Sequence, residues 1–363
     1  MKIAIIGTRG IPNYYGGFEQ FAEYVSVGLV DRSHEVTVYN SHTHPYQEKE
    51  YQGVKIIHCK DPEDKIGTAG QFIYDLNCIL DARKRNFDII LQLGYTSSSV
   101  WSRLFPKKAI ITTNMDGLEW KRTKYSKKVK KFLQYAEKLA VKHSDHLISD
   151  SIGIQDYLKD KYNKNSTYIP YGSDVFEKPN PQVLTEYELS ELNYDLLIAR
   201  LEPENSIEVI LNGVAMASLS RPFLVIGKHD TKYGAYLKEK FKLCDRIQFL
   251  GGIYDQNILN NLRFFSNIYF HGHTVGGTNP SLLEAMGSSA LICANDNTFN
   301  KAILGNDAVF FNSADDVAGY LQKIQKKSFS NFVENNSSKI KDVYNWNKII
   351  DQYETHFKDI LKV

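Results

Sequence analysis

The segment from 271 to 286, HGHTVGGTNPSLLEAM, contains a turn of small residues and carries the strongest chemical signal in the sequence. A strand is expected to end there and a helix to begin near Pro280, because proline has no N–H and suits a first helical turn. Glycines let the backbone approach a ligand closely, and the N–H groups at a helix start attract anions. We therefore predict a metal-free phosphate cradle formed by the backbone amides of Gly276, Gly277, Thr278 and Asn279.

Two charged residues are expected beside this cradle. Glu284 falls about one helical turn beyond Pro280, where its carboxylate can accept hydrogen bonds from ribose hydroxyls, although a solvated first-turn acid is the alternative. Arg200 follows a strand at 196–199, and open α/β sheets bind ligands at the carboxyl ends of their strands. Its planar guanidinium pairs well with phosphate, although an ion pair with Glu202 or Glu204 is the alternative.

Lys228 and Tyr254 are weaker candidates for contacts to the same ligand. Lys228 comes just after a strand that ends at Gly227, so its ammonium group can neutralise phosphate charge. Tyr254 follows a Gly-Gly pair, and its ring can stack on a nucleotide base. An aromatic residue at that point suits a hydrophobic core equally well, so both interpretations stay open.

A second glycine-rich segment, GTRGIPNYYGGFE at 7–19, lies between the first strand and the first helix. An NAD site is disfavoured because GxGxxG is missing and because the second strand ends in Asn40 rather than in an acid. A purely structural turn is the other alternative. We favour a ligand-contacting loop in which Gly16 and Gly17 approach the donor. The acceptor contacts expected from this loop are Tyr15, Phe18 and Glu19.

The elements that must position these segments are short hydrophobic strands that alternate with amphipathic helices. In the first half, we expect strands at 2–6, 35–39, 89–93, 109–113, 146–149 and 167–169, and a helix at 18–29. In the second half, we expect strands at 196–199, 223–226, 247–250, 268–271, 290–293 and 309–311. Such alternation is typical of parallel, doubly wound sheets.

Two α/β domains are therefore expected, and a chain of 363 residues is long enough for both. A polar, proline-containing stretch at 176–188 marks the region of the boundary. The expected domains are residues 1–172 and 173–343, followed by a C-terminal helix at 344–363 that packs back toward the first domain.

The composition excludes several classes of protein. A net charge of +2 is too small for a general nucleic-acid binder. Four widely spaced cysteines without a CxxC pair indicate neither a zinc site nor a disulfide framework, so a reducing cytoplasm is expected. No stretch approaches the roughly 20 apolar residues that span a bilayer.

Four longer motifs occur in order along the chain, at Arg9–Glu19, Asp116–Arg122, Arg200–Asn205 and His271–Met286. With these motifs the whole chain resembles the family-four retaining glycosyltransferases, and more narrowly the bacterial polysaccharide rhamnosyltransferases with a DUF1972-like N-terminal domain. The resemblance implies the GT-B fold, in which two Rossmann-like domains face a central cleft. It implies an acceptor-binding first domain, a nucleotide-sugar-binding second domain, and no metal or other cofactor.

The reaction that the resemblance implies is transfer of L-rhamnose from dTDP-L-rhamnose to a hexose on a polyprenyl diphosphate, with retention at the anomeric carbon. No covalent nucleophile is needed in that scheme, because the departing phosphate takes the proton of the acceptor hydroxyl. Arg200 and the turn amides then stabilise the charge on the leaving group. The alternatives are a UDP- or GDP-sugar donor, a sugar-nucleotide epimerase and a non-catalytic membrane scaffold.

The sequence departs from the wider family at two positions. The family usually has a glutamate eight positions before the helix glutamate, where this chain has Gly276, and a lysine shortly after the arginine, where this chain has Asn205. The better-supported donor contacts are then Arg200, Glu284 and the turn amides.

The segment 114–120 follows a strand that ends at Thr113, and in the resembled group it lines the sugar and acceptor side. Asp116 is therefore the first choice for a contact to the reacting hydroxyl, which makes Asp116, Arg200 and Glu284 the expected catalytic residues. A helix N-cap is the alternative for Asp116, and more strongly so for Asp150. The further acceptor contacts expected are Glu119, Trp120 and Asp150.

A basic run at 121–133, KRTKYSKKVKKFL, has hydrophobic residues interleaved at roughly helical spacing. Such a helix can rest on anionic lipid headgroups and present the site to a lipid-linked substrate, which predicts a cytoplasmic protein peripheral to the inner membrane. A solvated helix face is the alternative.

Overall fold

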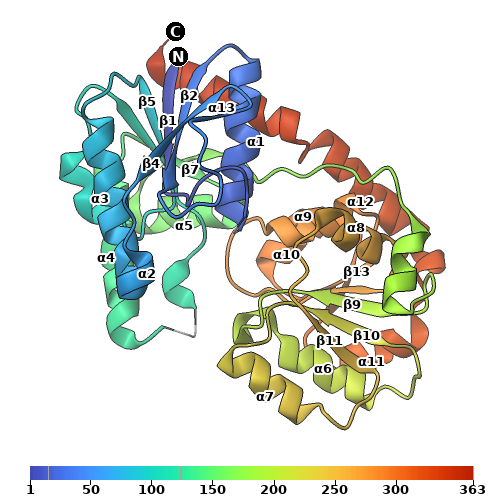
Figure 1. The fold of residues 1–363 in the computed structure, drawn as a ribbon. Coiled ribbons are helices and arrows are strands. Elements are labelled where there is room, and N and C mark those ends of the chain that lie inside the picture. Colours follow the sequence, from blue (N-terminus) through green and yellow to red (C-terminus); the bar gives the residue numbers. More distant parts are fainter. Residues whose placement is uncertain (15, 123–124, 363) are drawn as a thin grey trace. The chain divides into compact units, whose positions relative to one another are not determined.

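A computed structural model describes residues 1–14, 16–122 and 125–362, and in it the chain forms two α/β units (Figure 1). Unit 1 comprises Met1–Tyr171 and Trp346–Val363, and unit 2 comprises Gly172–Asn345. Each unit has its own parallel sheet and its own hydrophobic core.

Within the described residues of unit 1, eight strands form one sheet in the order β3-β4-β2-β1-β5-β6-β7-β8. Neighbouring strands are parallel, except that β3 pairs antiparallel with β4. The strands are β1 Lys2–Ile6, β2 Glu35–Ser41, β3 Glu50–Tyr51, β4 Val54–Cys59, β5 Ile89–Leu93, β6 Ile110–Asn114, β7 His146–Ser149 and β8 Thr167–Tyr168.

The central strands of unit 1 read as continuous hydrophobic runs because helices cover both faces of the sheet. In β1, Ile3, Ala4 and Ile5 are fully buried, and β5 is buried along its whole length. The helices of unit 1 are α1 Gly17–Asp31, α2 Glu63–Ile66, α3 Gly70–Ala82, α4 Lys127–His143, α5 Ile152–Tyr162 and α13 Trp346–Leu361, with 3₁₀ turns at Gly67–Ala69, Ser99–Leu104 and Glu119–Lys121.

The described part of unit 2 has a six-stranded, all-parallel sheet in the order β11-β10-β9-β12-β13-β14. Its strands are β9 Asp195–Ile198, β10 Phe223–Ile226, β11 Ile247–Gly251, β12 Tyr269–His271, β13 Ile292–Asn295 and β14 Val309–Phe311. Its helices are α6 Ile207–Met216, α7 Lys232–Lys240, α8 Gln256–Phe265, α9 Pro280–Gly287, α10 Thr298–Leu304, α11 Ala314–Lys323 and α12 Ser330–Asp342, with 3₁₀ turns at Pro181–Tyr187, Pro203–Asn205 and Lys326–Phe329.

The expected architecture of two doubly wound, parallel-sheet domains is confirmed, and most strand bounds agree to within two residues. The hairpin of β3 and β4 was not expected, because the exposed Lys55 interrupts an otherwise hydrophobic β4. The expected helix start at Lys121 is wrong. Helix α4 begins at Lys127, where the hydroxyl of Ser126 caps it by accepting from the Val129 amide at 3.4 Å.

Helix α13 packs on α1 within unit 1. Trp346 stacks on Tyr24 with ring centroids 4.5 Å apart, and Tyr353 meets Phe21 edge to face at 5.1 Å. A Cβ at Gly28 would lie 2.4 Å from Ile350, so glycine lets the two helices approach closely. His356 on α13 reaches the sheet, where its two ring nitrogens pair with Thr112 at 2.9 Å and Thr167 at 3.2 Å.

Each unit contains a buried histidine whose pKa is lowered by burial, to about 4 for His356 and to about 3 for His271. A histidine in the unfolded chain has a pKa near 6.5. Between these values the unfolded chain binds more protons, so the stabilisation present above pH 6.5 is lost as the pH falls. We expect each histidine to reduce the free energy of unfolding by about 2 kcal/mol between pH 7.5 and pH 5.

Denaturant titrations at pH 7.5 and pH 5 measure this effect. Glutamine at position 356 keeps hydrogen-bonding capacity but does not titrate in this range. The His356→Gln variant should therefore lose about half of the difference that the two histidines produce. An unchanged pH dependence would contradict the assignment of a neutral His356 in the folded state.

Candidate functional site

The strand order in unit 2 reverses between β9 and β12, which lie side by side although β10 and β11 come between them in the chain. In an open α/β sheet, the chain crosses to opposite faces after the two strands at such a reversal. A binding crevice forms there, at the carboxyl ends of these strands. The two loops are joined by backbone contacts. The amide and hydroxyl of Thr274 donate to the carbonyl of Glu204 at 3.0 and 2.8 Å.

Gly272 makes this approach possible. A Cβ at that position would lie 1.9 Å from the carbonyl oxygen of Asn205, so no other residue fits without moving the loop. The two segments singled out in the sequence, 200–205 and 271–286, are therefore neighbours at one edge of the sheet.

The turn before α9 offers backbone amides to a ligand. The amide of Ser281 is capped by the side chain of Asn279 at 2.9 Å, and the amides of Leu282 and Leu283 donate to the Asn279 carbonyl. In contrast, the amides of Gly276, Gly277 and Asn279 donate to no acceptor within the described part of the chain. The groups that could hold an anion thus belong to the turn itself rather than to the first turn of the helix.

Helix α9 is fixed against the sheet by hydrogen bonds of Tyr269 and by its own buried side chains. The hydroxyl of Tyr269, the fully buried first residue of β12, lies 2.8 Å from the hydroxyl of Ser281 and 3.4 Å from the carbonyl of Ile198. Leu282, Leu283 and Met286 are fully buried, so the helix cannot rotate without exposing apolar surface.

Glu284 is not a solvated acid. Its Oε2 accepts from the guanidinium of Arg263 at 2.6 Å, and that arginine, on α8, is 1% exposed. Arg263 also donates to Asn260 at 2.9 Å, which ties Glu284 to α8. The sequence contains no motif that marks Arg263, because its role depends on the packing of α8 against α9.

Arg200 is exposed at the carboxyl end of β9. Its guanidinium forms no ion pair with the residues that the structure describes, so the alternative pairing with Glu202 or Glu204 is not observed. The Arg200 carbonyl accepts from the side-chain amide of Asn205 at 2.7 Å, which holds the loop in a tight turn.

Lys228 and Tyr254 follow β10 and β11 at the same edge of the sheet. Lys228 pairs with Asp230 at 3.5 Å, and both side chains are mostly exposed, which makes the pair weak. Tyr254 is 79% exposed, so the interpretation of this residue as part of the core is wrong.

In unit 1, the loop of residues 7–19 is fixed by its own polar side chains. Glu19 is buried, and its Oε1 accepts from the amide of Arg9 at 2.9 Å and from the hydroxyl of Thr8 at 3.2 Å. Asn40 pairs with both backbone groups of Ile11, at 2.8 and 3.1 Å, so it serves the loop where an NAD enzyme would need an acid. Phe18 packs near Gly94, Gly16 and Gly17 begin α1, and Tyr15 lies outside the described residues.

Asp116 has a left-handed backbone, with φ of +49°, and it caps no helix in the described part of the chain. Its amide donates to Asn114 at 3.0 Å, and Asn114 in turn donates to the hydroxyl of Tyr353 at 3.1 Å. A non-glycine residue in this conformation is strained, and such residues cluster at functional sites. At the second candidate position, the helix cap is Ser151 rather than Asp150.

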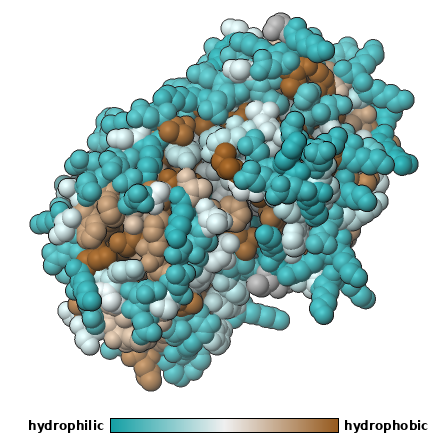
Figure 2. Space-filling view, turned by 180° about the vertical axis from the view of Figure 1, so that it is seen from behind, coloured by the Kyte–Doolittle hydropathy of each residue, from teal (hydrophilic) through white to brown (hydrophobic). Residues whose placement is uncertain are grey.

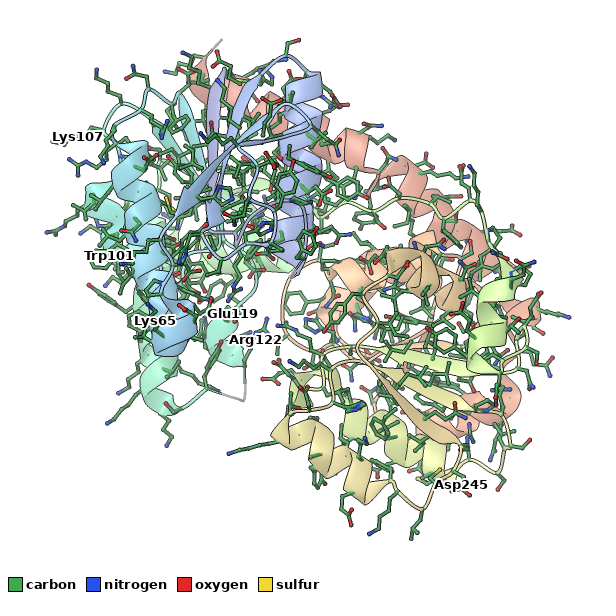
Figure 3. All side chains as sticks on the ribbon, viewed as in Figure 1. Lys65, Trp101, Lys107, Glu119, Arg122 and Asp245 are labelled. Carbon is green, nitrogen blue, oxygen red and sulfur yellow. The ribbon has the colours of Figure 1, made fainter. Side chains whose placement is uncertain are left out.

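Glu119 and Trp120 are held by other protein groups. Glu119 pairs with Arg122 at 2.6 Å (Figure 3). The indole N–H of Trp120 donates at 3.1 Å to Glu137, a carboxylate on α4 that is 1% exposed. Glu137 also accepts from Tyr157 at 2.7 Å and from Tyr162 at 2.6 Å, so a buried acid anchors the loop that carries Asp116.

Asp75 on α3 is another buried acid that sequence reasoning did not single out. Its carboxylate accepts from the hydroxyl of Ser97 at 2.6 Å, and burial raises its pKa to about 7. An acid at one position of an amphipathic helix carries no sequence signal of this burial.

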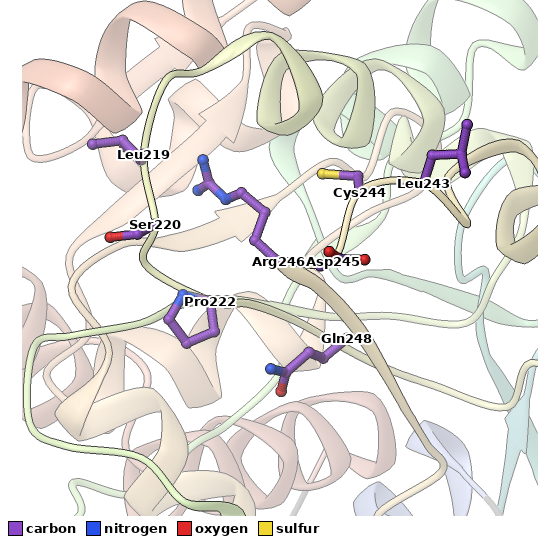
Figure 4. Close-up of a pocket in the computed structure, with 8 residues that line it drawn as sticks. All are labelled: Leu219, Ser220, Pro222, Leu243, Cys244, Asp245, Arg246 and Gln248. Atoms are coloured by element: carbon purple, nitrogen blue, oxygen red, sulfur yellow. The ribbon is translucent and has the colours of Figure 1, made fainter.

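The described residues were also searched for metal-binding clusters, membrane-spanning helices and pockets. They contain no cluster of three or more side chains suited to a metal ion, and none of their helices is long and apolar enough to cross a bilayer. A pocket of about 500 Å³ lies at the opposite edge of the unit 2 sheet, where Pro222 and Arg246 precede β10 and β11 (Figure 4). It is therefore separate from the candidate site.

Comparisons with known proteins agree with this architecture. Residues 1–174 match a sequence family described as "Domain of unknown function (DUF1972)". No curated protein sequence matches the chain.

Solved structures match over almost the whole chain. Sucrose-phosphate synthase from Thermosynechococcus elongatus is 17% identical with a TM-score of 0.82, and 99% of each chain is covered. HepE from Anabaena, in complex with UDP, is 13% identical with a TM-score of 0.75, covering 99% of this chain and 100% of that one. The trehalose-6-phosphate synthase OtsA is 10% identical with a TM-score of 0.73, and 99% of each chain is covered. The expected GT-B fold is thereby confirmed.

The buried pair of Arg263 and Glu284 generates a prediction about stability. Removing Arg263, which is 1% exposed, breaks an ion pair in the interior of unit 2, so Arg263→Ala should lower the free energy of unfolding by about 3–5 kcal/mol. Arg85, which pairs with Asp81 at the surface of unit 1, is the matched control, and Arg85→Ala should cost no more than about 1 kcal/mol. Denaturant unfolding of both variants measures the difference, and equal losses would contradict the burial of the pair.

Proposed function

We propose that this protein is a glycosyltransferase that binds the diphosphate of a nucleotide-sugar donor at the carboxyl edge of the unit 2 sheet. The proposal is carried by the reversal of strand order between β9 and β12, because the exposed guanidinium of Arg200 and the turn amides of Gly276 and Gly277 follow these two strands. Guanidinium groups and backbone amides both donate hydrogen bonds that suit phosphate oxygens. Among the similar structures, HepE was solved with UDP, with UDP and glucose, and with UDP-glucose.

In the proposed reaction, the acceptor hydroxyl attacks the anomeric carbon from the face that the diphosphate leaves. The proton of that hydroxyl passes to the departing phosphate oxygen, so the configuration is retained without a covalent nucleophile. Negative charge grows on the diphosphate in the transition state, and Arg200 and the turn amides stabilise it. Each such donor contributes roughly 2–4 kcal/mol to lowering the barrier.

Glu284 is proposed to accept hydrogen bonds from the ribose hydroxyls of the donor. Arg263 keeps this carboxylate in place through their ion pair at 2.6 Å. Tyr254, exposed beyond β11, is proposed to stack on the base, and Lys228 to add positive charge. Gly16 and Gly17 stay predicted donor contacts.

Asp116 is proposed to contact the reacting hydroxyl of the acceptor. Support comes from its strained backbone and from the chain of hydrogen bonds through Asn114 to Tyr353, which fixes its position. Phe18, Glu19, Glu119, Trp120 and Asp150 stay predicted acceptor contacts, and for the buried Glu19 and the anchored Trp120 such a role would be mainly to shape the site.

For the substrates, we propose dTDP-L-rhamnose as the donor and a hexose on a polyprenyl diphosphate as the acceptor, on the strength of the four sequence motifs. A UDP- or GDP-sugar donor is the second candidate. An epimerase would convert the donor with no acceptor present, and mass spectrometry of the donor incubated alone distinguishes the two activities.

Helix α4 supports a proposed contact with the cytoplasmic face of the membrane. Its exposed surface carries Lys127, Lys128 and Lys131, together with the apolar Val129 and the ring of Tyr135. The face of the protein in Figure 2 is mostly hydrophilic, with scattered hydrophobic patches. A basic helix with apolar residues binds anionic headgroups.

The proposed function is tested by replacing the guanidinium at the site. Arg200→Ala should lower kcat by about 10²–10³-fold, as for the loss of one oxyanion donor, while the KM for the acceptor changes little. Lys238, an exposed cation on α7, provides the control, and Lys238→Ala should keep full activity. The assay follows a lipid-linked acceptor by mass spectrometry with dTDP-, UDP- and GDP-sugars. Unchanged turnover in Arg200→Ala would remove this residue from the site.

Membrane docking is tested separately with the triple variant Lys127→Ala, Lys128→Ala, Lys131→Ala. Each lysine near an anionic surface contributes about 1 kcal/mol, so the loss should be roughly 100-fold in affinity for phosphatidylserine vesicles. A second triple variant, Lys238→Ala, Lys323→Ala, Lys341→Ala, removes the same charge from unit 2 and should bind normally. An equal loss of vesicle affinity in both variants would contradict docking through α4, because the affinity would then depend on net charge alone.

A further inference from the structure

Helix α3 carries hydrophobic residues on two opposite faces. Its inner face packs into the core of unit 1 through Tyr74, Cys78 and Ile79, which are at most 4% exposed. Its outer face carries Ile73 and Leu80, which are each 41% exposed and lie two helical turns apart on the same side. A helix at the surface of a globular protein normally has a polar outer face. The outer face of α3 is therefore better suited to an apolar environment than to water.

The same surface continues over α2 and α4. Figure 1 shows the three helices at one side of unit 1, and the rings of Phe72 on α3 and Phe132 on α4 lie with their centroids 5.6 Å apart. These helices carry five of the thirteen exposed large hydrophobic side chains of the described residues, although they make up less than a tenth of the chain. The five are Ile66, Ile73, Leu80, Val129 and Tyr135. Such a concentration indicates an interaction surface.

Cations surround these apolar side chains. The exposed ones on the three helices and directly after α3 include Lys65, Arg83, Lys84, Lys127, Lys128 and Lys131. Within the described helices α2, α3 and α4, one acid is exposed, Asp64, while Asp81 pairs with Arg85 at 2.5 Å. An anionic bilayer places negative headgroups directly above apolar acyl chains, so it matches both the cations and the apolar side chains of this surface.

We propose that α3 enters the interface of an anionic membrane with Ile73 and Leu80, while the surrounding cations bind the headgroups. A helix of this kind lies in the plane of the interface, and its apolar side chains reach the boundary of the acyl chains. The inference rests on the membrane contact of the proposed function and adds to it a second element, α3, and an apolar component of binding. The electrostatic component is screened by salt, whereas the apolar component is not.

The test measures binding of the full-length protein to vesicles of phosphatidylserine and phosphatidylcholine by sedimentation. The double variant Ile73→Gln, Leu80→Gln changes no charge but removes two apolar side chains from the surface. We expect its affinity at low salt to fall about 30-fold, because these side chains no longer gain from leaving water. At roughly 0.5 M salt the wild type should bind less tightly than at low salt, but still more tightly than the double variant.

Unit 2 provides a matched control with Met216 and Leu243, which are 54% and 90% exposed. The variant Met216→Gln, Leu243→Gln should bind vesicles like the wild type, and an equal loss in it would overturn the inference. Leu80→Trp gives a second readout, because indole rings favour the membrane interface. Its fluorescence should shift to shorter wavelength when vesicles are added, and an unshifted spectrum would place α3 outside the bilayer.

The other outcomes separate the inference from the proposals before it. Unchanged affinity in Ile73→Gln, Leu80→Gln would overturn the insertion of α3 while leaving docking through α4 intact. Wild-type protein that binds no vesicles would overturn both, although not the donor site, which Arg200→Ala tests independently. Self-association in lipid-free solution that the double variant lacks, measured by analytical ultracentrifugation, would overturn the inference by assigning the surface to a second copy of the chain. Melting temperatures check that the variants are folded.

Discussion

The contact between the loops after β9 and β12 is the constraint on which the rest of the candidate site depends. It exists because Gly272 has no side chain, and because the backbone of Thr274 binds the carbonyl of Glu204. Residues some 70 positions apart are thereby held at the edge where the strand order reverses. Arg200 and the turn amides acquire a fixed geometry from these backbone contacts.

In unit 1, the corresponding loops are held in place by side chains instead. Its loop after β1 is held by the carboxylate of Glu19 and the carboxamide of Asn40, both of which are buried and bonded to backbone groups. The segment after β6 is held through Trp120 by the buried carboxylate of Glu137. Polar groups used in this way cost desolvation and are stable only when fully paired, which makes the unit 1 loops more sensitive to single substitutions.

Much of the fold could be predicted because buried parallel strands leave continuous hydrophobic runs, as in β1, β5 and β10. The glycine turn and the start of α9 at Pro280 could be predicted because proline and glycine act through local backbone geometry. The roles of Arg263, Glu137 and Asp75 could not be predicted, because a buried charged side chain is recognised only from the residues that pack around it. The pairing of His273 with Asn205 was also hidden, because the two residues are 68 positions apart in the chain.

Because α13 belongs to unit 1, the chain leaves that unit after Tyr171 and returns to it at Trp346, so unit 2 is an insertion between two parts of its neighbour. The ribosome therefore completes unit 2 before it has made the helix that supplies Trp346, Tyr353 and His356 to unit 1. During synthesis the second half of the sequence can reach its native packing first. Part of the apolar surface of unit 1 stays uncovered until the residues of α13 emerge.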